Sequence, residues 1–183
     1  LGFLGTLIAL ERAVALGARW GFAAPAITGL GGLALVVGAP AGVAGGLLLA
    51  GGVVYAGMYL AFDRIEATLH TRIQWLGAFG WLGALTLVLA GRPVAVAVPW
   101  LGAFLVLTIV GERLELSRVR RLTPAARRAF LAAALLLVVG VAWTIVDFDL
   151  GIRLAGVGLV ALAAWLGVQD IARRTVRTSG LPR

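Results

Sequence analysis

The chain has 183 residues, of which 61% are hydrophobic and 13% are charged, and its mean hydropathy is +1.02. Because charged residues make up about 25% of an ordinary soluble domain, this composition excludes that class and favours an all-α polytopic membrane protein. All 16 basic residues are arginine, the formal net charge is +8, and the arginines gather at the ends of apolar stretches. We therefore expect them to bind the anionic headgroups of a lipid bilayer, and we expect no nucleic-acid partner.

The sequence contains no cysteine, which excludes disulfides, thiolate metal sites, iron–sulfur clusters and cysteine nucleophiles. It also lacks the motifs of nucleotide-driven transport, zinc proteolysis and serine hydrolysis. These exclusions leave open whether the chain is an enzyme, and they assign no catalytic residue and no metal ligand.

Three apolar stretches at the start of the chain predict three membrane spans. Residues 1–16 reach their first charge at Glu11, whereas a helix needs about twenty residues to cross the hydrocarbon core. We therefore expect the first span to be incomplete and the chain to be a fragment of a longer membrane protein, with flanking transmembrane segments beyond its ends. No charge separates the second and third spans, expected at 20–39 and 41–62, so a tight hairpin at Pro40 should join them.

Four further apolar stretches predict spans at 73–91, 94–111, 129–146 and 150–169. A dense basic segment, Gly111–Arg128, separates the fifth span from the sixth and contains six arginines. Within it, Thr123 and Pro124 have the residue types of an N-cap and a first helical position. The sequence therefore predicts one transmembrane domain of about seven spans over residues 1–183.

The distribution of arginine over the loops predicts the topology. With Arg12 counted at the end of the first span and Arg153 at the start of the seventh, the segments after spans one, three, five and seven hold two, two, six and four arginines, whereas those after spans two, four and six hold none, one and one. Basic loops stay on the cytoplasmic side during insertion. We therefore expect an integral protein of the bacterial cytoplasmic (inner) membrane, with the arginine-rich loops after spans one, three and five and the C-terminus in the cytoplasm.

Three pairs of an acidic residue followed by arginine recur at the inner ends of the odd spans. One interpretation makes Glu11 and Glu112 proton acceptors at the membrane boundary. In the other, each pair reaches headgroups or clasps a neighbouring helix end, because adjacent residues of a helix point about 100° apart. The recurrence also leaves open whether the chain contains repeated helical hairpins. The pairs are Glu11–Arg12, Asp63–Arg64 and Glu112–Arg113.

At hydrocarbon depth, away from the ends of the predicted spans, the polar residues are uncharged, which argues against a proton pump or ion-coupled transporter contained in this chain. His70 is the one histidine; since a membrane metal site needs several converging ligands, we expect it to be a solvated loop side chain. Trp81 lies deeper than the other tryptophans and is the one expected to line a cavity.

Two stripes of glycine predict places where helix backbones approach each other closely. Gly42 and Gly46 form one such stripe in the third predicted span. Gly77, Gly80 and Gly83 form the other in the fourth predicted span.

Two segments carry a family resemblance: GFLGTLIALERAVALG at Gly2–Gly17 and LTIVGERLELSRV at Leu107–Val119. They resemble segments of an uncharacterised family of longer bacterial polytopic membrane proteins. That family is remotely similar to the NnrS proteins, which are associated with haem, copper and nitric oxide, and through them to haem-copper oxidases. Such cofactor sites use histidines inside spans, and this chain has none there. The resemblance therefore implies haem or copper only in a full-length protein and gives no residue here a ligand role.

Two main hypotheses of function follow. The first, implied by the resemblance, is the non-ligating half of an NnrS-like haem or copper membrane protein in respiratory or nitrogen-oxide metabolism. The alternative is a component of a small-molecule transporter or permease, or a structural membrane scaffold.

Overall fold

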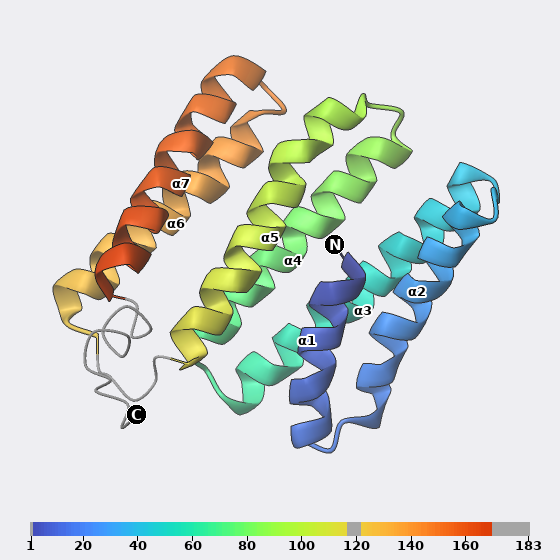
Figure 1. Ribbon diagram of the computed structural model, residues 1–183, viewed down its shortest axis with the longest axis horizontal. Helices are drawn as coiled ribbons and strands as arrows, with labels where there is room; N and C mark the ends of the chain where they lie inside the picture. The colour runs from blue at the N-terminus through green and yellow to red at the C-terminus, as the bar shows by residue number, and fades with distance from the viewer. Residues whose placement is uncertain (1, 117–121, 170–183) are drawn as a thin grey trace, which may run out of the picture. The chain divides into compact units, whose positions relative to one another are not determined.

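The computed structural model describes residues 2–116 and 122–169, and within these ranges the regular structure is entirely helical. The all-α prediction is therefore confirmed. The helices are α1 (Gly2–Ala15), the 3₁₀ turn η1 (Arg19–Phe22), α2 (Ala23–Val36), α3 (Ala41–Ile65), α4 (Leu69–Leu89), α5 (Val94–Leu116), α6 (Pro124–Trp143) and α7 (Phe148–Gln169) (Figure 1).

Five of these helices, α3 to α7, are long and apolar enough to cross a membrane. Helices α1 and α2 have 14 residues each, short of the roughly twenty that a span requires. The predicted second span is shorter than expected because η1 takes up its first residues. Pro25 is the third residue of α2, and proline is tolerated in the first turn of a helix because the N–H groups there have no intrahelical partner. Five candidate spans, rather than seven, are thus present among the described residues.

The chain forms two compact units, Leu1–Glu112 (unit 1) and Arg113–Arg183 (unit 2). Unit 1 contains α1 to α4 and α5 as far as Glu112, and unit 2 contains α6 and α7. The prediction of a single domain over residues 1–183 and the prediction of repeated hairpins stay predictions.

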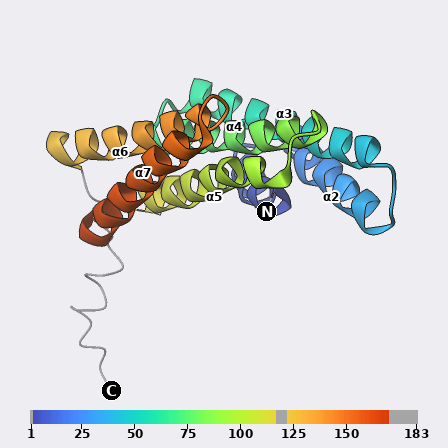
Figure 2. The same cartoon turned by 90° about the horizontal axis from the view of Figure 1, so that it is seen from above.

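In unit 1, α2 and α3 form the predicted hairpin, which turns at Gly38 with a positive φ of 75° and at Pro40, the N-cap of α3. Helices α4 and α5 lie side by side in both views (Figure 1, Figure 2). A Cβ atom on Gly80 would lie 2.7 Å from the Trp100 carbonyl oxygen, so the two backbones approach closely there. The stripe predicted on the fourth span is therefore confirmed as a helix contact.

The stripe predicted on the third span is wrong, because Gly42 and Gly46 face open space. The contacts of α3 are made by Gly51, which packs on Thr28 of α2, and by Gly52, which packs on Trp81 of α4. The spacing of small residues therefore predicted correctly that α3 packs closely on other helices, but the glycines that make the contacts are Gly51 and Gly52.

Large aromatic side chains fill the core of unit 1. Tyr55 and Tyr59 meet edge to face at 5.1 Å between ring centroids, and Phe104 of α5 meets Tyr55 at 6.1 Å. Trp81 is 8% exposed, and Cβ atoms on Gly2 of α1 and on Gly52 of α3 would both overlap its ring. Trp81 therefore packs between helices.

In unit 2, α6 and α7 pack through glycine. A Cβ atom on Gly158 would lie 2.5 Å from the backbone nitrogen of Leu137, and one on Gly151 would lie 2.5 Å from that of Thr144. The indole nitrogen of Trp165 donates to the Ala126 carbonyl oxygen at 2.8 Å. Close backbone contact over several turns therefore holds this hairpin together.

The start of α6 confirms the predicted cap, because the Thr123 hydroxyl accepts a hydrogen bond from the Ala126 backbone N–H at 3.2 Å and Pro124 opens the helix. The helix therefore begins before Ala129, and Arg127 and Arg128 belong to it. Three of the six arginines of the basic segment lie outside the described residues: Arg118, Arg120 and Arg121. The four arginines after the seventh predicted span also lie outside them.

Candidate functional site

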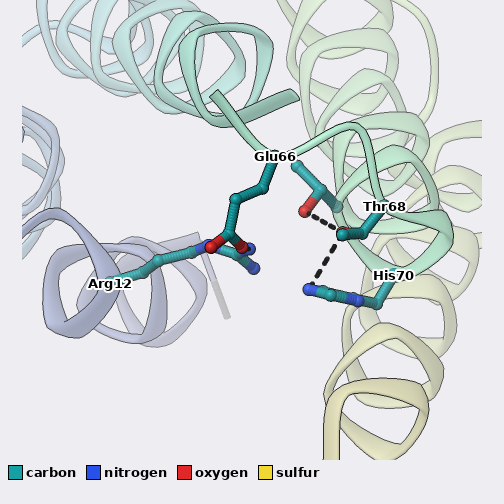
Figure 3. Close-up of polar contacts among 5 residues, drawn as sticks. Arg12, Glu66, Thr68 and His70 are labelled. Carbon is teal, nitrogen blue, oxygen red and sulfur yellow. Dashed lines mark hydrogen bonds and ion pairs between the residues drawn. The ribbon is translucent and has the colours of Figure 1, made fainter. Parts of the chain in front are cut away.

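Polar side chains collect at one end of unit 1, where α1 and α3 end and α4 begins. Arg12 of α1 reaches across to Glu66, the C-cap residue of α3, and the Arg12 Nη2 and Glu66 Oε2 atoms are 3.2 Å apart (Figure 3). The Arg12 side chain is 14% exposed, and its guanidinium lies 5.7 Å from the centroid of the Phe62 ring. An ion pair and a cation–π contact thus tie α1 to the end of α3.

His70 lies in the same region and is only 4% exposed, so the prediction of a solvated loop side chain is wrong. The reason is that α4 begins at Leu69, before the predicted start at residue 73, which places His70 in the first turn of a packed helix. Its Nε2 atom lies 3.1 Å from the Thr68 hydroxyl, which also lies 2.7 Å from that of Thr71 (Figure 3). Within residues 2–116 and 122–169, no three His, Cys, Asp or Glu residues converge as metal ligands would.

One turn deeper, α4 and α5 share a polar contact. The Gln74 amide nitrogen donates to a Glu112 carboxylate oxygen. Glu112 lies inside a helix because α5 continues past the predicted end at Gly111 to Leu116. Gly111 permits the contact, since a Cβ atom there would overlap the Gln74 side chain. A carboxylate therefore lies near the end of a candidate span. The expectation that no charge lies at hydrocarbon depth stays a prediction.

From Gln74 inward, three buried polar atoms have no hydrogen-bond partner among the described residues. They are Gln74 Oε1, the Tyr55 hydroxyl and Trp81 Nε1. The Tyr55 hydroxyl lies near the hydroxyls of Tyr59 and Thr108. The Thr108 hydroxyl uses its hydrogen to donate to the Phe104 carbonyl oxygen of its own helix at 2.8 Å. We call the set of polar side chains from the helix ends to the middle of α4 the polar column: Glu112, Gln74, Tyr59, Tyr55, Thr108 and Trp81.

In each of the three predicted acid–arginine pairs, one residue contacts another helix end or helix and its neighbour in the chain is exposed. Arg12 pairs with Glu66, whereas Glu11 is exposed. Asp63 binds Arg72, with 3.0 Å between Oδ1 and Nε. Arg64, the neighbour of Asp63, is exposed, and so is Arg113, the neighbour of Glu112. Acids and arginines do meet across elements, as a clasp requires, but their partners are Glu66 and Arg72.

Sequence reasoning missed Gln74 and Glu66 as members of the site. A signal was available in the spacing of His70 and Gln74, which are four residues apart, and of Thr108 and Glu112, which are also four apart. Residues at that spacing share one face of a helix, so each helix presents two polar groups on the same side.

The fold and the site together define a class: a helical protein with membrane-length apolar helices and a polar column inside one unit. A family model described as a domain of unknown function (DUF8744) matches residues 1–183, and the chain belongs to this family. No curated protein and no solved structure matches the chain.

Proposed function

We propose that the chain is a component of a small-molecule transporter or permease, and that the polar column of unit 1 is where the solute binds. The observation that carries the proposal is the set of buried polar atoms in α3 and α4 that have no hydrogen-bond partner among residues 2–116 and 122–169. A buried donor or acceptor that is left unsatisfied costs about 1–3 kcal/mol. Such atoms persist at functional sites, where a bound solute or water supplies the missing hydrogen bonds.

The chemistry of the polar column suggests the kind of solute. Tyr55 and Trp81 offer an O–H and an N–H, and the Gln74 side-chain oxygen offers an acceptor. The Glu112 carboxylate lies beside Gln74 and disfavours an anion. The proposed solute is therefore small, forms hydrogen bonds and is neutral or cationic.

The substitution Tyr55→Phe tests the proposal because it removes the hydroxyl and keeps the ring. Loss of an unsatisfied buried hydroxyl should raise thermal stability, while loss of one hydrogen bond to the solute should lower its flux roughly three- to tenfold. The assay is uptake of glycerol, urea or methylammonium into proteoliposomes that contain the purified protein. Thr86→Val is the matched control, since that hydroxyl donates to the Leu82 carbonyl oxygen on an exposed face of α4.

Two outcomes contradict this proposal. One is a wild-type protein that carries none of these solutes faster than empty liposomes do. The other is a Tyr55→Phe protein with unchanged flux and lowered stability, which would make the hydroxyl a structural group.

The proposed location is the bacterial cytoplasmic membrane, with the ends of α1, α3 and α5 on the cytoplasmic side. Its support is the arginine content of those loops, together with the Arg12–Glu66 contact, which brings the ends of α1 and α3 together. A reporter fused after Arg121 should report a cytoplasmic position, and one inserted at Asp147–Asp149 an external position. The opposite pattern would contradict the proposed topology.

The second candidate is the non-ligating half of an NnrS-like haem or copper protein. The observation that favours it is that the described parts of the two resembling segments include α1 and the end of α5, which supply Arg12 and Glu112 to the site. The test is to purify the longer protein that the resemblance implies and to measure its absorption spectrum and its copper content. A haem band or bound copper supports this candidate, and their joint absence rejects it.

A further inference from the structure

A cavity of about 330 Å³ lies between α3 and α4, and its lining contains none of the residues of the polar column. This volume is in the range of small-molecule sites in proteins. The cavity is lined by Leu60, Asp63, Arg72, Trp75 and Leu76.

Charged and apolar lining residues lie at different depths. Asp63 and Arg72 form an ion pair with 3.0 Å between Oδ1 and Nε, in the last turn of α3 and the first turn of α4. Leu60 lies three residues before Asp63, and Trp75 lies three residues after Arg72, so each is about one turn further from the helix end. The cavity thus has a charged end at the helix termini and apolar walls beneath it.

The cavity borders the outer surface of unit 1. Leu60 is 42% exposed, and Phe79, whose ring meets that of Trp75 edge to face at 4.8 Å, is 45% exposed. Both belong to helices long enough to span a membrane. On the proposed membrane location, on which this inference rests, these side chains face lipid chains, and the ion pair lies at the depth of the headgroups.

We propose that this cavity binds a phospholipid with a zwitterionic, primary-ammonium headgroup, the chemistry of phosphatidylethanolamine. The Arg72 side chain is 57% exposed and offers guanidinium N–H groups beyond the Nε that binds Asp63, so it donates to the phosphate. The Asp63 carboxylate accepts from the ammonium group. An acyl chain lies along Leu60, Trp75 and Leu76.

Charge complementarity selects this headgroup. A purely anionic headgroup would bring a phosphate to Arg72 but no cation of its own to Asp63, so the site would carry a net negative charge. A choline headgroup carries the positive charge but has no N–H to donate to Asp63. The ion pair in the cavity matches a lipid that has both a phosphate and an N–H donor.

The experiment is native mass spectrometry of the full chain, released from nanodiscs of phosphatidylethanolamine, phosphatidylcholine or phosphatidylglycerol with identical acyl chains. The wild-type protein should retain phosphatidylethanolamine roughly fivefold better than either of the others, the size expected of one partly exposed ionic contact. Asp63→Asn should lose the preference over phosphatidylcholine, and Arg72→Gln should weaken retention of all three lipids. Arg72→Lys should keep the preference, and Arg92→Gln, which changes an exposed arginine in the loop between α4 and α5, is the matched control.

Equal retention of the three lipids by the wild-type protein, a preference for phosphatidylglycerol, or an unchanged preference in Asp63→Asn would each overturn the lipid site. Alkaline carbonate extraction of cell membranes tests the underlying location separately. A chain released by carbonate contradicts the membrane location itself. A chain that stays in the membrane without selecting the lipid contradicts this inference alone.

Discussion

Units 1 and 2 bury polar side chains in different ways. In unit 2 the buried Thr144 hydroxyl donates to the Val141 carbonyl oxygen of the same chain segment at 2.6 Å, and glycines allow α6 and α7 to touch. In unit 1, Tyr55, Gln74 and Trp81 each bury an atom without a partner among the described residues. Unit 2 shows that apolar helices can pack closely through small residues, with one hydrogen bond from Trp165 to Ala126 between them. Buried polar atoms without partners are therefore not required for helix packing, which favours a functional role for those of unit 1.

Substitution of a contact glycine in unit 2 should give the largest effect. In Gly140→Leu, the side chain would collide with the backbone of Ala155 on α7, where no side-chain rotation can relieve the overlap. We expect a loss of about 3 kcal/mol in the free energy of unfolding of the α6–α7 hairpin. The measurement is unfolding by denaturing detergent, followed through the fluorescence of Trp165.

Gly156→Leu is the matched control for Gly140→Leu, because Gly156 of α7 faces open space. It should unfold like the wild-type protein. Equal losses in the two variants would show that glycine at these positions matters for helix formation rather than for contact, and the contrast drawn for unit 2 would fail.

Loss of a polar side chain should have a smaller effect, and one that differs between the units. Gln74→Leu leaves the Glu112 carboxylate without its hydrogen bond from Gln74, for which we expect a loss of about 1–3 kcal/mol in unfolding free energy. Thr144→Val removes a hydroxyl that donates to the Val141 carbonyl oxygen three residues earlier, and it should change stability less. Thermal unfolding of the two variants in one detergent gives the comparison. A larger loss for Thr144→Val would reverse the assignment of polar function to unit 1.

The helices and their order could be predicted from the sequence because apolar runs, Pro40 and the Thr123–Pro124 cap are local signals. The number of membrane-length helices could not. The segment predicted as the second span is apolar throughout, yet η1 shortens its α-helix to Ala23–Val36. Hydropathy measures the polarity of a segment and does not distinguish a 3₁₀ turn from an α-helix.

The candidate site was predicted in part. The recurrence of acids beside arginines directed attention to Arg12, Asp63 and Glu112, which do form contacts at the helix ends. The partners of these residues depend on which helices pack against each other. The arginine pattern predicts the side of the membrane on which a loop lies, and it does not predict which helices are neighbours. The apolar pattern predicts the start of the fourth span at residue 73, which leaves His70 in a loop, whereas α4 begins at Leu69 and buries it. The error in the exposure of His70 therefore follows from an error of four residues in one helix boundary.

The smallest effect is expected for the ion pair that links α1 to the end of α3. Glu66 is 46% exposed in its side chain, so water and salt screen its attraction to Arg12, and the coupling energy of the pair should be about 0.2–1 kcal/mol. A double-mutant cycle of Arg12→Gln and Glu66→Gln, measured by thermal unfolding at low and high salt, gives this value, with the exposed Arg19→Gln as the matched control. The coupling should shrink as salt rises, because the pair lies near solvent. A coupling several times larger and insensitive to salt would mean that the pair is shielded from water, contrary to the exposure of Glu66.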